Sequence, residues 1–197
     1  VALVGGDRAW VVFDPDEGDR TAGELMVRPM VAQLDEDEKD VLARLAQPDF
    51  DAVVIVDNSG GPVGIITEHD GVRMAADRLD ELPKVGEVAH SEWVSAPPKE
   101  ALRHARGRLV AQRARHLLVE DDEGLHGVVS LRDLIDERKG APVRSVMRPQ
   151  LFTIAPDASV ADAARLMLRE RIGVLPVVGS EGVIGIIDRP LLIKLLL

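Results

Sequence analysis

The stretch Gly185-Ile186-Ile187-Asp188-Arg189-Pro190-Leu191 decides the fold, because the pattern that it opens occurs three times in the chain. In each copy a glycine precedes two aliphatic residues and then a polar or acidic residue. The other copies read Gly64-Ile65-Ile66-Thr67-Glu68-His69-Asp70 and Gly127-Val128-Val129-Ser130-Leu131-Arg132-Asp133. The three glycines are separated by 63 and then by 58 residues. Such a period indicates an array of similar structural units, each of about sixty residues.

The third unit shows most clearly how one repeat is built. An extended run at 151–154 precedes a turn in which Asp157 or Ser159 is a candidate helix N-cap. Apolar residues then follow the i, i+3, i+4, i+7 spacing of an amphipathic helix, at Val160, Ala163, Ala164, Met167 and Leu168. Aliphatic runs at 174–178 and 183–187 predict a β-hairpin, and a closing helix follows it. The predicted order is strand, helix, strand, strand, helix.

The first two units repeat this order. In unit two we expect a strand at 93–95, a helix at 98–110 and a hairpin at 116–119 and 125–129. In unit one we expect a strand at 31–34, a helix whose Asp35 and Glu38 have capping-box spacing, and a hairpin at 53–56 and 63–66. The sequence therefore predicts an α/β fold of α+β sandwich-like units.

The units divide the chain into four segments: 1–20, an N-terminal hairpin; 21–84, unit one; 85–140, unit two; and 141–197, unit three. The hairpin is expected from the runs 1–4 and 10–13. It is interpreted either as the remnant of a further unit or as an unrelated N-terminal strand. The chain begins with Val1 rather than Met, so it is compatible with being part of a longer polypeptide.

Composition excludes several classes of function. The net charge of −10 argues against nucleic acid as a partner, since binding to phosphate backbones requires basic patches. The absence of cysteine removes disulfides and thiolate chemistry and fits a reducing compartment. We see no apolar run near the roughly 20 residues that span a membrane. We therefore expect a cytoplasmic protein without a membrane span.

These repeats resemble a known family, the CBS (cystathionine beta-synthase) domain, whose units pair in Bateman modules. The resemblance covers about residues 22–197. It is strongest from Val146-Met147-Arg148-Pro149 through Leu175-Pro176-Val177-Val178 to Gly185 and the aliphatic pair after it. Each piece is weak alone, but the ordered set occurs three times.

The resemblance implies a fold and a mode of action. Each unit would have the order β-α-β-β-α, and two units would pack through their sheets as a pseudo-two-fold pair. The two clefts of such a pair hold adenosine-containing ligands. The family implies a regulatory or sensor protein rather than an enzyme, with no required cofactor and with AMP, ADP, ATP or S-adenosylmethionine as candidate ligands.

The repeated motif suits a nucleotide chemically. Its glycine permits close backbone approach, its hydroxyl donates to phosphate at a helix N-terminus, and its aspartate accepts from ribose hydroxyls. The candidate nucleotide-binding residues are Val31, Val53, Gly64, Ile66, Thr67, His69 and Asp70 in unit one, and Trp93, His116, Gly127, Val129, Ser130, Arg132 and Asp133 in unit two. We predict no catalytic and no metal-binding residues, because the histidines are dispersed.

Unit three departs from the motif. Asp188 replaces the hydroxyl and would repel phosphate, and Leu191 replaces the ribose-binding acid. We therefore expect unit three to bind no nucleotide through its own motif. A competing interpretation applies to the other two motifs, because a Ser or Thr followed three residues later by Asp is also a helix cap.

Two pairings of the units remain open. Units one and two could pair, or unit two could pair with unit three while the N-terminal hairpin pairs with unit one; the linker lengths favour the second. An odd number of units leaves an apolar face uncovered, so we expect a homodimer. The alternatives to a ligand sensor are a protein-protein interaction scaffold and the regulatory part of a longer enzyme or transporter.

Overall fold

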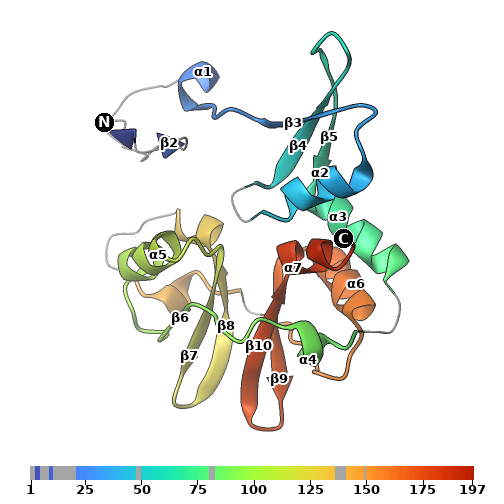
Figure 1. Ribbon diagram of the computed structural model, residues 1–197. Coiled ribbons are helices and arrows are strands. Elements are labelled where there is room, and N and C mark those ends of the chain that lie inside the picture. The colour runs from blue at the N-terminus through green and yellow to red at the C-terminus, as the bar shows by residue number, and fades with distance from the viewer. Residues whose placement is uncertain are drawn as a thin grey trace.

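The structure is a computed structural model that describes residues 3–4, 9–10, 21–47, 50–79, 83–135, 141–148 and 150–197. Three similar units lie within these ranges, each with a small sheet and its own helices (Figure 1). The expected α/β architecture is confirmed: all three units contain the helix and the hairpin, and units one and two also contain the first strand.

Unit one contains a three-stranded sheet of order β3-β4-β5, in which β3 pairs parallel with β4 and β4 pairs antiparallel with β5. Its elements are β3 (Met30–Gln33), α2 (Glu38–Leu45), β4 (Ala52–Val56), β5 (Pro62–Thr67) and α3 (Glu68–Arg78). The predicted capping box of Asp35 and Glu38 is wrong. Asp37 is the N-cap of α2 and accepts from the amide of Lys39, because the chain turns for two more residues before the helix begins.

Unit two has the same sheet order, β6-β7-β8. Its elements are β6 (Ser95–Ala96), α5 (Leu102–Ala111), β7 (His116–Asp121), β8 (Gly124–Ser130) and the 3-10 helix η1 (Leu131–Leu134). The first strand and the first helix both begin later than predicted. Residues 97–100 form a turn, closed by a hydrogen bond from the Glu100 amide to the Pro97 carbonyl, so the helix cannot start at Pro98.

Unit three matches its prediction closely. Its elements are α6 (Val160–Glu170), β9 (Val174–Gly179), β10 (Gly182–Asp188) and α7 (Arg189–Lys194). Of the two candidate caps, Ser159 is the N-cap of α6, and its hydroxyl accepts from the amide of Asp162. The expected strand at 151–154 is reduced to one parallel bridge between Ile154 and Val177.

At the N-terminus, β1 (Leu3–Val4) pairs antiparallel with β2 (Ala9–Trp10). This agrees with a hairpin, although residues 11–13 of its expected second strand lie outside the described residues. A short helix, α1 (Ala22–Leu25), then leads into unit one.

Units one and three share a hydrophobic core. Helix α3 of unit one packs against α6 and α7 of unit three (Figure 1). One core cluster combines Val72 and Ala75 of α3 with Leu192 of α7, all nearly inaccessible to solvent. The helices approach closely at Gly71, where an added β-carbon would lie 2.7 Å from Cγ1 of Ile193. Unit one is therefore attached to unit three through helices, which leaves its sheet free of that contact.

Units two and three face each other, with β8 beside β10 (Figure 1). Their leading segments are exchanged. Helix α4 (Val85–Val88) is the first element of unit two but binds unit three, where the amides of Val85 and Gly86 donate to the carbonyls of Ala158 and Pro156. The 3-10 helix η2 (Val143–Ser145) is the first element of unit three but binds unit two, through hydrogen bonds to Glu100 and Pro98. Each unit of this pair thus holds the segment that leads into the other.

The exchanged segments explain the glycine of the repeated motif. A β-carbon added at Gly185 would lie 2.8 Å from the carbonyl oxygen of His90, just after α4. A β-carbon at Gly127 would lie 3.0 Å from Cε of Met147, just after η2. At Gly64 of unit one the nearest atom in the described chain is Cβ of Ile55, at 4.0 Å. The motif glycine therefore makes room for a neighbouring segment in units two and three.

Candidate functional site

A cavity of about 490 Å³ lies at the centre of the molecule, where units two and three meet beneath unit one. Residues from all three units form its wall. They are Asp51 and Glu68 of unit one; Arg113, Ala114, Arg115, His116, Val128, Ser130, Leu131, Arg132, Asp133 and Ile135 of unit two; and Arg148, Gln150, Leu151, Phe152, Arg171, Ile172, Gly173, Val174, Ile186, Asp188, Arg189 and Pro190 of unit three.

The cavity wall is rich in arginine. Six arginines line it against four carboxylates, an excess of two positive charges in a chain whose net charge is −10. Arg113, Arg132, Arg148 and Arg171 are exposed at its rim, and their guanidinium groups make no hydrogen bond or ion pair to another described residue. An anion that enters the cavity would meet several arginines whose donors face solvent.

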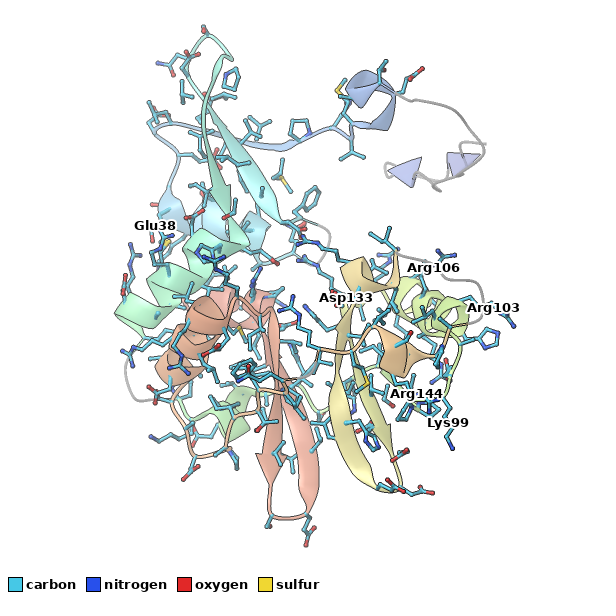
Figure 2. All side chains as sticks on the ribbon, turned by 180° about the vertical axis from the view of Figure 1, so that it is seen from behind. Glu38, Lys99, Arg103, Arg106, Asp133 and Arg144 are labelled. Carbon is cyan, nitrogen blue, oxygen red and sulfur yellow. The ribbon has the colours of Figure 1, made fainter. Side chains whose placement is uncertain are left out.

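The motif of unit two lies in this wall. Ser130 and Asp133 form a capping box, in which the Ser130 amide and hydroxyl donate to Asp133 Oδ2 at 2.8 and 2.5 Å. Figure 2 shows Asp133 at the end of β8, on the side of unit two that faces the centre of the molecule. His116 and Arg132 line the same cavity, so four of the predicted residues of unit two are brought together.

The degenerate motif of unit three contributes to the opposite wall. Asp188 caps α7 by accepting from the amide of Leu191 at 3.0 Å. Burial alone would raise the pKa of Asp188, but the nearby His90, whose Nε2 lies 3.7 Å from Oδ1, and the hydrogen bond from Leu191 outweigh burial and hold that pKa below its ordinary value. The same contact raises the pKa of His90. Asp188 therefore places a negative charge in the cavity wall opposite Asp133.

His116 is a neutral wall residue. Burial lowers the pKa of its imidazole to about 4. The ring lies against Gly173, where an added β-carbon would be 2.8 Å from His116 Nε2. At neutral pH the imidazole therefore offers one hydrogen-bond donor and one acceptor rather than a positive charge.

The motif of unit one is arranged differently. Thr67 and Asp70 form a capping box, in which the Thr67 amide and hydroxyl donate to Asp70 Oδ2 at 2.9 and 2.6 Å. The hydrogen bond from the Thr67 hydroxyl holds the pKa of Asp70 below its ordinary value. Neither residue lines the central cavity or the second cavity, of about 440 Å³, that Trp93 lines. Their neighbour Glu68 instead lines the central cavity.

Other predicted residues lie elsewhere. Val53 and Val129 are completely buried in the cores of their units, so their side chains offer no surface to a ligand. Trp93 donates to Glu120 at 2.9 Å and lines a separate cavity of about 440 Å³ between the hairpin ends of units two and three. Gly127 packs against Met147.

In unit one, His69, Val31 and Gly64 are exposed and Ile66 packs against the core.

Sequence reasoning missed most of the arginines. Arg113 and Arg171 both follow the first helix of their unit, and both have the left-handed backbone, with φ of 52° and 55°. Aligning the two helix ends would have revealed this correspondence. No comparable sequence pattern marks Arg115, Arg148 and Arg189. They come from separate segments, and only folding brings them together.

Two clusters of charged side chains lie away from the cavity. Asp121, Glu123 and His126 at the β7–β8 turn have ligand atoms within 4.8 Å of one another. His126 Nε2 lies 2.6 Å from Asp121 Oδ1, and this hydrogen bond lowers the pKa of Asp121. Four exposed basic residues occupy the outer edge of unit two: Lys99, Arg103, Arg106 and Arg144 (Figure 2).

Comparison with known proteins identifies relatives of the same architecture. The chain is 29% identical to the protein MJ1404 of Methanocaldococcus jannaschii over 197 residues, a match that covers 89% of this chain and 47% of MJ1404. The structure of MJ1225 from the same organism superposes with a TM-score of 0.76 at 20% identity, covering 87% of this chain and 67% of that one. CBSX2, solved in complex with AMP, is 29% identical with a TM-score of 0.52, over 57% of this chain and 95% of that one.

None of the helices that the structure describes is long and apolar enough to cross a membrane. The CBS domain family matches residues 22–77, 85–140 and 143–197, one match for each unit. These ranges cover the three sheets, their helices and the wall of the central cavity. The chain belongs to the CBS domain family.

Proposed function

We propose that the protein is a non-catalytic regulatory sensor that binds an adenine nucleotide in the central cavity. The arginine-rich wall carries this proposal, because it combines a positive excess with the Ser130 and Asp133 motif. The AMP complex of CBSX2 supports it, since that relative is 29% identical. The volume of about 490 Å³ falls in the range of small-molecule sites.

The helix cap and ligand binding are compatible at Asp133. The cap uses Oδ2, which accepts from both the amide and the hydroxyl of Ser130. A carboxylate has two oxygens, so Oδ1 is available to accept from the ribose hydroxyls. The rim residues Arg113 and Arg171 lie where a phosphate group would be held by charge-assisted hydrogen bonds.

The charge of the cavity wall also favours some candidate ligands over others. S-adenosylmethionine carries a positively charged sulfonium, which a wall with six arginines repels. AMP, ADP and ATP carry phosphate groups that the same wall attracts. We therefore propose a phosphate-bearing nucleotide rather than S-adenosylmethionine.

Calorimetric titration with AMP, ADP, ATP and S-adenosylmethionine tests the proposed ligand. Asp133→Asn should weaken nucleotide binding about 10- to 100-fold, because it removes a charged acceptor for ribose. Asp70→Asn is the matched control, since it changes the equivalent capping box outside the cavity and should leave this affinity unchanged. If no nucleotide produces heat or raises the melting temperature of the wild-type chain, the proposal is wrong.

We also propose that the protein is a homodimer in which unit one is covered by a second copy. Its sheet face exposes large aliphatic side chains: Val31 (40%), Leu34 (70%), Val63 (54%) and Ile65 (60%). After α1, Met26 and Val27 are 76% and 64% exposed. Units two and three bury the corresponding segments against each other. Two copies could exchange their α1 segments in the same manner, each beside Gly64 of the other.

Gly64→Val tests this dimer. The β-carbon would be 4.0 Å from its nearest neighbour in the monomer, so the fold should persist, whereas a segment beside Gly64 would be blocked. Light scattering during gel filtration should give a dimer mass for the wild type and a monomer mass for the variant. Gly107→Ala is the control, because it too adds a β-carbon in open space, on α5 away from this face. A wild-type monomer, or an unchanged dimer of Gly64→Val, would contradict the proposed interface.

A further inference from the structure

Arg115 connects the central cavity to unit one. Its Nη1 lies 2.7 Å from Glu68 Oε1 and 2.6 Å from Asp51 Oδ1, and all three residues line the cavity. Arg115 immediately precedes β7 of unit two, whereas Asp51 and Glu68 flank the β4–β5 hairpin of unit one. This ion pair thus bridges two units and joins residues that lie 47 positions apart in sequence.

Glu68 is unusually buried for an acid. Only 7% of its side chain is exposed, compared with 27% for Arg115 and 77% for Asp51. Its amide also donates to the Asp51 carbonyl, which fixes the two acids together. Burial raises the pKa of Glu68, while the charge of Arg115 opposes that rise. The Glu68 carboxylate therefore depends on Arg115 as its charged partner.

Arg115 lines the same wall as Arg113 and Arg171, the proposed phosphate contacts. Arg115 is next to His116 in the wall, and its carbonyl accepts from the Leu131 amide, within the unit-two motif. An arginine has five donors in a rigid fork, but the side of the fork that faces Glu68 cannot also bind a phosphate. A phosphate and the two carboxylates of unit one therefore compete for one cation.

We propose that Glu68 and Asp51 compete with the phosphate of a bound nucleotide for Arg115, so that unit one sets the affinity of the cavity for phosphate. This inference rests on the proposed nucleotide site and concerns how that site is regulated. The two effects are reciprocal. The contact of unit one with Arg115 lowers the affinity for the ligand by some factor, and a ligand bound to Arg115 weakens the contact of unit one by the same factor. A change in the position of unit one would then report that the cavity is occupied.

The test compares AMP with adenosine, which lacks only the phosphate. Glu68→Gln keeps the shape of the side chain and removes its charge, so it should tighten AMP binding about 5- to 10-fold and leave adenosine binding unchanged. Asp51→Asn should tighten AMP in the same direction, and because Asp51 is exposed this variant should not disturb folding. Asp77→Asn is the matched control, since it removes one exposed charge from the same helix, α3, outside the cavity wall.

Hydrogen exchange of the wild type gives a second measurement. AMP should increase exchange in peptides around residues 64–72, where unit one meets Arg115, and adenosine should not. If AMP binds the wild type but Glu68→Gln and Asp51→Asn leave its affinity unchanged or weaker, the competition is refuted and the nucleotide site stands. If neither AMP nor adenosine binds the wild type, both the competition and the nucleotide site are refuted.

Discussion

Replacing Leu192 by alanine is expected to lower the free energy of unfolding by about 2–5 kcal/mol, the range for a leucine truncated in a well-packed core. Leu192 is completely buried in α7. Its core cluster includes Val72 and Ala75 of unit one together with Leu175 of unit three. The cavity left by the substitution would therefore weaken the attachment of unit one as well as the packing of unit three. Chemical denaturation followed by circular dichroism measures the change.

Leu197→Ala is the matched control for this substitution. Leu197 lies near the same chain end but is 49% exposed, so its truncation should change the free energy of unfolding by less than about 0.5 kcal/mol. A loss below about 1 kcal/mol for Leu192→Ala would show that units one and three do not share the core described here.

Gly185→Ala is expected to destabilise the protein by about 1–3 kcal/mol, although it adds a single methyl group. The new β-carbon would lie 2.8 Å from the His90 carbonyl oxygen and 3.1 Å from Cβ of Ala89. His90 and Ile186 exchange two backbone hydrogen bonds of 2.9 Å at this point. The backbone at His90 would have to move, and those hydrogen bonds would lengthen. Thermal unfolding monitored by calorimetry provides the measurement.

Gly127→Ala offers a comparison at the equivalent position of unit two. Its β-carbon would meet the flexible end of Met147 rather than backbone, so the loss should be below about 1 kcal/mol. Equal losses for the two variants would mean that loss of a glycine, and not the approach of the exchanged segment, sets the effect.

Most of the fold could be predicted because its signals are local. The aliphatic run at 183–187 and the cap at Ser159 lie within short windows, and both are found in the structure. Errors arose where several local choices were nearly equal. Asp35 and Asp37 are both acceptable caps, but Asp35 lies in the turn that follows β3, and Asp37 caps the helix. The strand at 151–154 shrinks to one bridge, at which Ile154 donates to the Pro176 carbonyl and accepts from the Val178 amide. Pro176 has no N–H to extend this pairing.

The candidate site was only partly predictable. The motif located Ser130 and Asp133, since a strand followed by a helix start fixes them at the end of β8. Val53 and Val129 were misjudged because alternation along a strand cannot tell which face meets the core and which meets a ligand. The convergence of arginines from both units depends on how those units pack, and no window of sequence contains that information.

The exchanged leading segments have a consequence for how this architecture can be divided. The body that contains β9 and β10 also includes Val85–Val88, which begins unit two in the chain. The body that contains β7 and β8 includes Val143–Ser145, which lies near the start of unit three. A cut between sequence repeats therefore removes a piece from each of the two bodies. The smallest part of the chain that keeps both bodies whole is therefore units two and three together.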